Sequence, residues 1–96
     1  MDKYDQLEKK LCTIKEYLRV VEVNGNATKS YIVNYERYVD SLIKLVHNRK
    51  ICNSNGALLG LTRGISDYEE LCSCERLWKA VQDADNYYSR VCVNFE

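Results

Sequence analysis

No proline and only four glycines interrupt the 96 residues of this chain. Proline breaks helices and both residues mark turns, so their scarcity favours long, continuous helices over a turn-rich β fold. Apolar residues also recur at steps of three and four over residues 2–23, 28–50 and 67–92. This spacing places them along one side of a helix. The sequence therefore predicts an all-α fold, a small helical bundle of three long helices plus one short helix, in a single helical domain over residues 1–96.

The first two predicted helices are separated by residues 24–28, which read NGNAT. Asn-Gly is a strong turn signal, and Asn26 or Thr28 is expected to cap the second helix by accepting its free N–H groups. A loop this short makes the two helices antiparallel neighbours.

The short third helix is expected to follow Asn53 or Ser54, either of which can cap it. Gly64 stands where a left-handed residue commonly ends a helix. Ser66 and Glu69 then have the spacing of a capping box that begins the fourth helix. We therefore expect a corner where one helix ends and the next begins with almost no loop between them.

Part of this corner, LLGLTR, resembles the first helix and turn of bacterial helix-turn-helix proteins, in which Leu-Gly-Leu-Thr precedes a recognition helix. The resemblance covers about fifteen residues and implies a small DNA-binding transcriptional regulator. In that interpretation Arg49, Lys50 and Arg63 contact phosphate. This is the alternative function that the sequence offers.

Two observations argue against DNA binding. The would-be recognition helix begins with Asp67, Glu69 and Glu70, at positions that meet bases and phosphates, where carboxylates are repelled. The chain also carries 14 basic and 14 acidic residues, and gripping a phosphate backbone needs uncompensated positive charge. Nucleic acid is therefore not the expected partner.

Charge is nevertheless distributed unevenly along the chain. Residues 29–64 carry six bases and two acids, a net +4, whereas residues 65–96 carry three bases and seven acids, a net −4. Complementary fields usually meet at contacts, so we expect these two regions to face each other within the fold or across a dimer.

The sequence gives little support to catalysis or metal binding. His47 is the only histidine, and no carboxylate is fixed beside it by sequence. Cys72 and Cys74 are two residues apart, which in a continuous helix turns their side chains about 200° from each other. Strong zinc signatures instead use paired C-x-x-C spacings. We predict no enzyme activity, no metal and no cofactor.

Three glycines, Gly56, Gly60 and Gly64, recur at steps of four. Small residues spaced in this way allow another part of the chain to approach closely. The same glycines can equally mark helix ends, and the sequence leaves both interpretations open.

Tyrosine is the most unusual feature of the composition, with eight copies against one Phe and one Trp. Tyr31, Tyr35 and Tyr38 lie along one line of the second helix. A buried tyrosine needs a hydrogen-bond partner, so tyrosine is more typical of interfaces than of cores. Either these rings form a recognition surface, or they cover the core while their hydroxyls reach water.

We conclude from the sequence that the chain is a non-enzymatic protein-binding module, a small adaptor or inhibitor of the kind that phages and mobile elements encode. The partner is another protein, or a second copy of the chain in a homodimer. No secretory signal or membrane span is visible, so a cytoplasmic location is expected. The predicted protein-binding residues are Tyr31, Tyr35, Tyr38, Asp67, Glu69 and Glu70.

Overall fold

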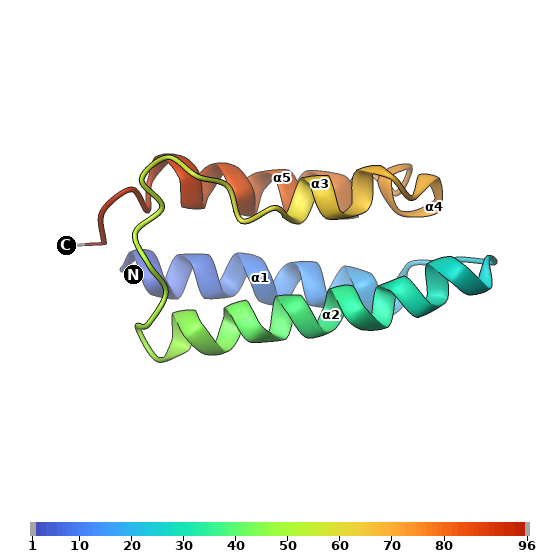
Figure 1. Ribbon diagram of the computed structural model, residues 1–96, viewed down its shortest axis with the longest axis horizontal. Coiled ribbons are helices and arrows are strands. Elements are labelled where there is room, and N and C mark those ends of the chain that lie inside the picture. Colours follow the sequence, from blue (N-terminus) through green and yellow to red (C-terminus); the bar gives the residue numbers. More distant parts are fainter. Residues whose placement is uncertain (1, 96) are drawn as a thin grey trace.

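The computed structural model describes residues 2–95 and is all-α (Figure 1). Within these residues it contains α1 (Lys3–Val20), α2 (Asn26–His47), α3 (Leu61–Ser66), α4 (Glu69–Cys72) and α5 (Glu75–Arg90). The three long helices, α1, α2 and α5, lie side by side along a bundle with extents of 43 × 21 × 18 Å. The predicted small helical bundle is confirmed, with two short helices in place of the one expected.

The core follows the apolar stripes that the sequence predicts. In α1 the stripe residues Leu7, Leu11 and Ile14 have no exposed surface, and Leu18 is nearly buried. α1 packs against both α2 and α5. Burial of apolar area from all three helices is the main stabilising contribution to such a bundle. To the same core the other two long helices contribute Tyr35, Val39, Leu42, Val46, Leu77, Val81, Ala84 and Tyr88.

The helix ends differ from the predictions by a few residues. Asp2 caps α1 by accepting the N–H of Asp5 at 2.8 Å, but the helix ends at Val20 rather than at residue 23. α2 begins at Asn26 after Gly25, and no side chain caps it, so the predicted cap by Asn26 or Thr28 is wrong.

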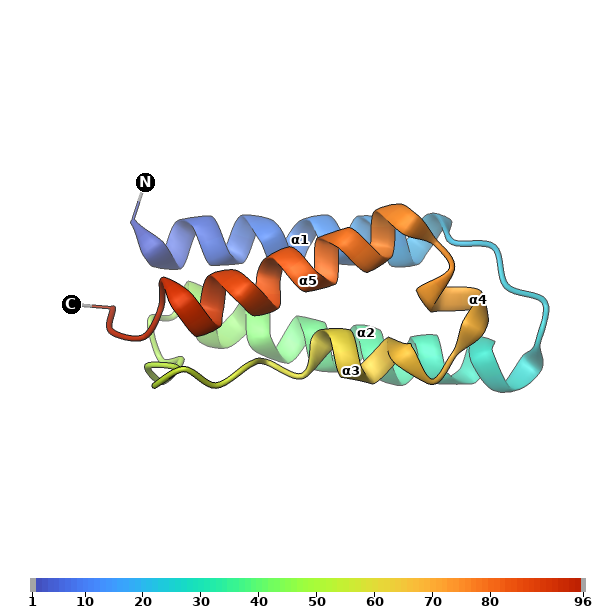
Figure 2. The ribbon, with the colours of Figure 1, turned by 90° about the horizontal axis from the view of Figure 1, so that it is seen from above.

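The largest correction concerns the helix predicted over residues 67–92, which is interrupted at Ser73 and Cys74. Cys74 has an extended backbone and begins α5 as its N-cap residue. The interruption turns α4 across the end of the bundle, beside the loop that joins α1 to α2 (Figure 2). In this placement Leu71 is completely buried.

The segment between α2 and α3 is also not the helix that was predicted after Asn53 or Ser54. Residues 51–60 are irregular and cross from α2 to the layer that holds α3, α4 and α5 (Figure 1). Gly60 adopts the left-handed conformation, with φ 82°, immediately before α3. The left-handed conformation favours glycine, because glycine has no Cβ to clash with the backbone.

The corner itself is confirmed, although its chemistry differs from the prediction. α3 ends at Ser66 and α4 begins at Glu69. Gly64 lies inside α3 rather than after it, and Ser66 donates to the carbonyl of Arg63 instead of capping α4. The capping box of Ser66 and Glu69 is therefore wrong.

The expected pairing of the basic and acidic regions is not seen within residues 2–95. No ion pair there joins a base of residues 29–64 to an acid of residues 65–96. Arg49 instead pairs with Asp2 and Asp5 at the start of α1. Pairing across a dimer stays a prediction.

No helix in the described part of the chain combines the length and the apolar content that crossing a bilayer requires.

Candidate functional site

The three tyrosines of α2 attach that helix to the segment that leads into α3. The hydroxyl of Tyr38 donates to the carbonyl of Leu59 at 2.6 Å, and that of Tyr35 donates to the carbonyl of Leu61 at 2.7 Å. The hydroxyl of Tyr31 donates to the carbonyl of Gly64. The rings cover the core, as one sequence interpretation had it, but their hydroxyls bond to the backbone rather than to water.

The environment of Tyr35 keeps its hydroxyl protonated. Burial raises the pKa of Tyr35 far above its usual range, and the nearby Asp85 carboxylate adds to this effect. A protonated hydroxyl is required for donation to Leu61. Partial burial, together with the Asp85 carboxylate, also raises the pKa of Tyr38. Through these hydrogen bonds Tyr35 and Tyr38 hold residues 59–61 against α2.

Asp85 of α5 is the residue that fixes the start of α3, and it was not among the predicted site residues. Its side chain is 2% exposed. Its Oδ1 accepts the N–H groups of Leu59 and Leu61 at 3.1 and 3.3 Å, and its Oδ2 accepts that of Thr62 at 2.7 Å. A helix start leaves such N–H groups unpaired, so this carboxylate acts as a cap delivered from another helix.

An apolar groove lies between the C-terminal half of α2 and residues 57–59. Its volume is about 370 Å³, within the range of ligand pockets. Three of its lining side chains remain open to solvent: Tyr38 at 43% exposure, Leu45 at 41% and Leu58 at 57%. The remaining lining residues are Leu42, Lys50, Ile51, Cys52, Ala57, Leu59 and Tyr88.

The wall of the apolar groove formed by residues 51–59 is irregular but held by hydrogen bonds. Tyr88 donates its hydroxyl to the carbonyl of Cys52 at 2.8 Å, and Ser89 donates to the carbonyl of Gly56 at 2.7 Å. The N–H of Ser54 donates to the carbonyl of Cys92 at 2.9 Å. With Tyr38 bonded to Leu59, the segment is fixed on both sides of Leu58. The exposed Leu58 is therefore presented by a fixed backbone.

The acidic start predicted for the fourth helix is divided by the structure. Glu70 folds back onto the loop before α2, where its carboxylate accepts the N–H of Asn24 at 2.6 Å and of Gly25 at 3.2 Å. The bond from Asn24 is the main cause of a lowered pKa of Glu70. Asp67 and Glu69 remain exposed and make no contact with the apolar groove.

The basic residues of the DNA-binding alternative are not brought together. Arg49 pairs with two carboxylates of the α1 start and lies over the ring of Tyr4. Lys50 lines the apolar groove. Arg63 is in α3 next to Gly64, which lies against Tyr35 in the middle of α2, whereas Lys50 comes after the C-terminal end of that helix. DNA binding stays an untested prediction, and Lys50 and Arg63 lie on separate parts of the surface.

His47 and the cysteine pair differ in their surroundings from what the sequence suggested. The Nδ1 atom of His47 lies 2.8 Å from the carboxylate of Glu8 at the surface. Because the helix is interrupted at Ser73 and Cys74, Cys72 and Cys74 do not lie on one continuous helix, and the angle of about 200° expected between their side chains does not apply. Among the described residues, no group of three or more His, Cys, Asp or Glu side chains is placed to hold a metal ion.

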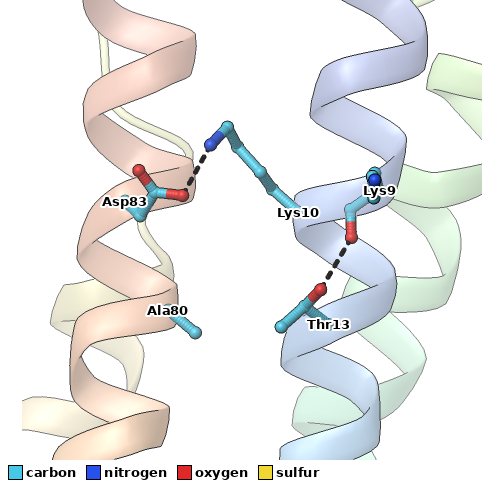
Figure 3. Close-up of a pocket in the computed structure, with 5 residues that line it drawn as sticks. All are labelled: Lys9, Lys10, Thr13, Ala80 and Asp83. Carbon is cyan, nitrogen blue, oxygen red and sulfur yellow. Dashed lines mark hydrogen bonds and ion pairs between the residues drawn. The ribbon is translucent and has the colours of Figure 1, made fainter.

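A second depression, of about 240 Å³, lies between α1 and α5 (Figure 3). Lys10 of α1 reaches across it to Asp83 of α5 at 2.7 Å, and Thr13 donates to the carbonyl of Lys9. The ion pair spans the depression and pairs its two opposite charges. The lining therefore offers little to a partner beyond the free amino group of Lys9.

The sequence contained a signal for Asp85 but not for the apolar groove. An aspartate inside the apolar series Val81, Ala84, Tyr88 is a buried charge, and a buried carboxylate must be hydrogen-bonded. The groove depends on how the irregular residues 51–59 lie against α2, and no local pattern determines that.

Comparison with protein-family models, with curated proteins and with solved structures found no match to this chain.

Proposed function

We propose that this chain is a non-enzymatic protein-binding module, a small adaptor or inhibitor, and that its binding surface is the apolar groove. The observation that carries the proposal is the exposure of Leu45 and Leu58 on opposite walls of one groove. Large apolar side chains gathered at a concave site are typical of surfaces that bind partners.

The fixed backbone around Leu58 supports this proposal. A loop that must be ordered on binding subtracts from affinity, whereas a preformed surface avoids that cost. Hydrogen bonds from Tyr38 and Ser89 hold the chain on both sides of Leu58 before any partner arrives.

The structure also changes which predicted residues we propose for binding. Tyr38 stays in the proposed surface because its ring lines the groove. Tyr31 and Tyr35 bond to carbonyls of the neighbouring segment, and Glu70 bonds to the loop before α2, so these three act within the fold. Asp67 and Glu69 remain available to solvent but lie outside the proposed surface.

Selection of a displayed random peptide library against the 96-residue chain tests this function. Selected peptides are expected to bind the unmodified protein. Their affinity for the Leu58→Ser variant should be at least about tenfold weaker, because burying one leucine contributes about 1.5 kcal/mol or more. The exposure of Leu58 means that this substitution should leave the fold intact.

The matched control is Val20→Ser, which removes an apolar side chain outside the groove that is even more exposed than Leu58, at 73% against 57%. The selected peptides should bind it as they bind the unmodified chain. The proposal fails if no peptide is enriched, or if the Leu58 and Val20 variants bind the peptides equally well.

A further inference from the structure

The apolar groove has a length and direction that match a helix. Tyr38, Leu42 and Leu45 of α2 line it in sequence, and the seven helical steps from Tyr38 to Leu45 span about 10 Å. A second helix lying along the groove presents side chains at i, i+3 or i+4 and i+7 over the same distance. Recognition of an amphipathic helix in an apolar groove depends on such anchors.

The rim of the apolar groove is positively charged. Of the three bases that make up this rim, Lys50 lines the groove itself. Arg37 and Lys44 are exposed on α2 beside it, about 100° around the helix from the lining residues Tyr38 and Leu45. None of these three bases has an ion-pair partner among the described residues. They are therefore free to meet charge on a partner.

The acids of α2 do not neutralise this rim. Asp40 pairs with Lys15 of α1 at 2.7 Å, and Glu36 lies 3.9 Å from Arg19, which is also in α1. Both carboxylates are thus turned toward α1. The wall formed by residues 51–60 contains no charged residue. The groove therefore combines an apolar floor with uncompensated positive charge on its α2 side.

We propose that the occupant of this groove is an acidic amphipathic helix of a partner protein. Its apolar side chains lie between Leu45 and Leu58, and its flanking Asp or Glu side chains meet Lys44 and Lys50. This inference rests on the proposed function and specifies the chemistry of the partner. The lining favours protein over single-stranded nucleic acid, because two of its three exposed apolar side chains, Leu45 and Leu58, are aliphatic, whereas bases stack on aromatic rings.

The test uses two labelled helical peptides of about 18 residues, long enough to form a helix. Both carry leucines at i, i+4, i+7 and i+11, and their flanking positions are all Glu in one and all Lys in the other. Fluorescence anisotropy with the full chain is expected to show binding of the Glu peptide, at least about tenfold tighter than the Lys peptide.

Reversing the rim charge should reverse this preference. The double variant Lys44→Glu/Lys50→Glu is expected to weaken the Glu peptide about tenfold and to strengthen the Lys peptide. The matched control, Lys9→Glu/Lys79→Glu, makes the same change in net charge on α1 and α5 and should keep the original preference. A preference that follows net charge in both variants overturns the inference.

The remaining outcomes separate this inference from the function on which it rests. If both peptides bind equally and Leu58→Ser weakens both, the groove binds proteins without charge selection, so only the inference fails. If the Glu peptide does not bind at about 1 mM, the inference also fails, and the library selection decides on the function.

Two other occupants are distinguished in the same experiment. If a single-stranded oligonucleotide displaces the Glu peptide and its binding weakens steeply with salt, the occupant is nucleic acid and the inference is overturned. If the chain is a dimer in light scattering and Leu58→Ser makes it monomeric, the occupant is a second copy, and the inference is again overturned.

Discussion

At the scale of single residues, Asp85 connects α5 to the start of α3. One buried carboxylate accepts three backbone N–H groups of the segment that begins α3. The same segment continues from Leu58, so Asp85 also holds one wall of the apolar groove in place. A change here should affect both the stability of the fold and the shape of the groove.

Asp85→Asn tests this role. The Asn oxygen can accept from Leu59 and Leu61 or from Thr62, but in either orientation its NH₂ group faces a backbone N–H. We expect a loss of at least about 2 kcal/mol. The resulting fall in melting temperature is about 8 °C or more for a chain of this size.

The control for Asp85→Asn is Asp83→Asn on the same helix. Asp83 is exposed and pairs with Lys10 at the surface, and such pairs contribute at most about 1 kcal/mol. Thermal melts followed by circular dichroism compare the two. Equal melting temperatures would contradict the role assigned to Asp85.

At the scale of elements, α3 approaches α2 closely because Gly64 has no side chain. A Cβ atom at Gly64 would lie 2.8 Å from Cε2 of Tyr35 and 3.3 Å from the hydroxyl of Tyr31. Tyr35 cannot easily withdraw, since it is buried and its hydroxyl is bonded to Leu61. Of the two sequence interpretations of the spaced glycines, close approach applies at Gly64.

Gly64→Ala is therefore expected to destabilise the protein, although alanine is the better helix former by about 1 kcal/mol. Overpacking in a filled site costs about 1–3 kcal/mol, so we expect a net loss of about 1 kcal/mol. Chemical denaturation measures it. Arg63→Ala, at the exposed neighbouring position, should be neutral or slightly stabilising. A gain of stability in Gly64→Ala would show that α3 can move away from α2.

α4 depends on Glu70, and this dependence should be sensitive to pH. The pKa of Glu70 is lowered in the folded state from its usual value of about 4.5. The ionised carboxylate therefore stabilises the fold fully at pH values above 4.5. That contribution is lost as the pH falls through the lowered pKa. Glu70→Gln should therefore be less stable than the unmodified protein at neutral pH, and the difference should shrink in acid.

Thermal melts at neutral pH and well below pH 4.5 measure this difference. Glu69→Gln is the control, because the adjacent Glu69 is exposed, and the N–H groups of the loop before α2 donate to Glu70 instead. Its effect should be small at both pH values. A difference for Glu70→Gln that stays constant with pH would mean that its carboxylate charge does not stabilise α4.

The elements also show where prediction from sequence succeeds. The stripe of Leu7, Leu11 and Ile14 has helical spacing, and each of these residues is buried as predicted. The interruption at Ser73 and Cys74 has no such local signal, because neither proline nor glycine marks it. It arises from contacts distant in sequence, including the stacking of Tyr68 on Tyr31 and the bonds of Glu70.

At the scale of the whole molecule, the candidate site was only partly predictable. The predicted tyrosine line shares one residue with the apolar groove, since Tyr38 lines it. The partners of those hydroxyls could not be predicted, because each lies more than 20 residues away in sequence. Leu45 and Leu58 come together only when residues 51–60 cross the bundle.

We propose the apolar groove as the binding surface, in place of the tyrosine line and of the acidic residues of α4. The measurement that tests this most directly is two-dimensional amide NMR of the isotopically labelled chain, titrated with the Glu peptide. We predict that the largest shifts occur at Tyr38, Leu45, Lys50 and Leu58. Largest shifts at Asp67 and Glu69, or around Tyr31, would contradict the account.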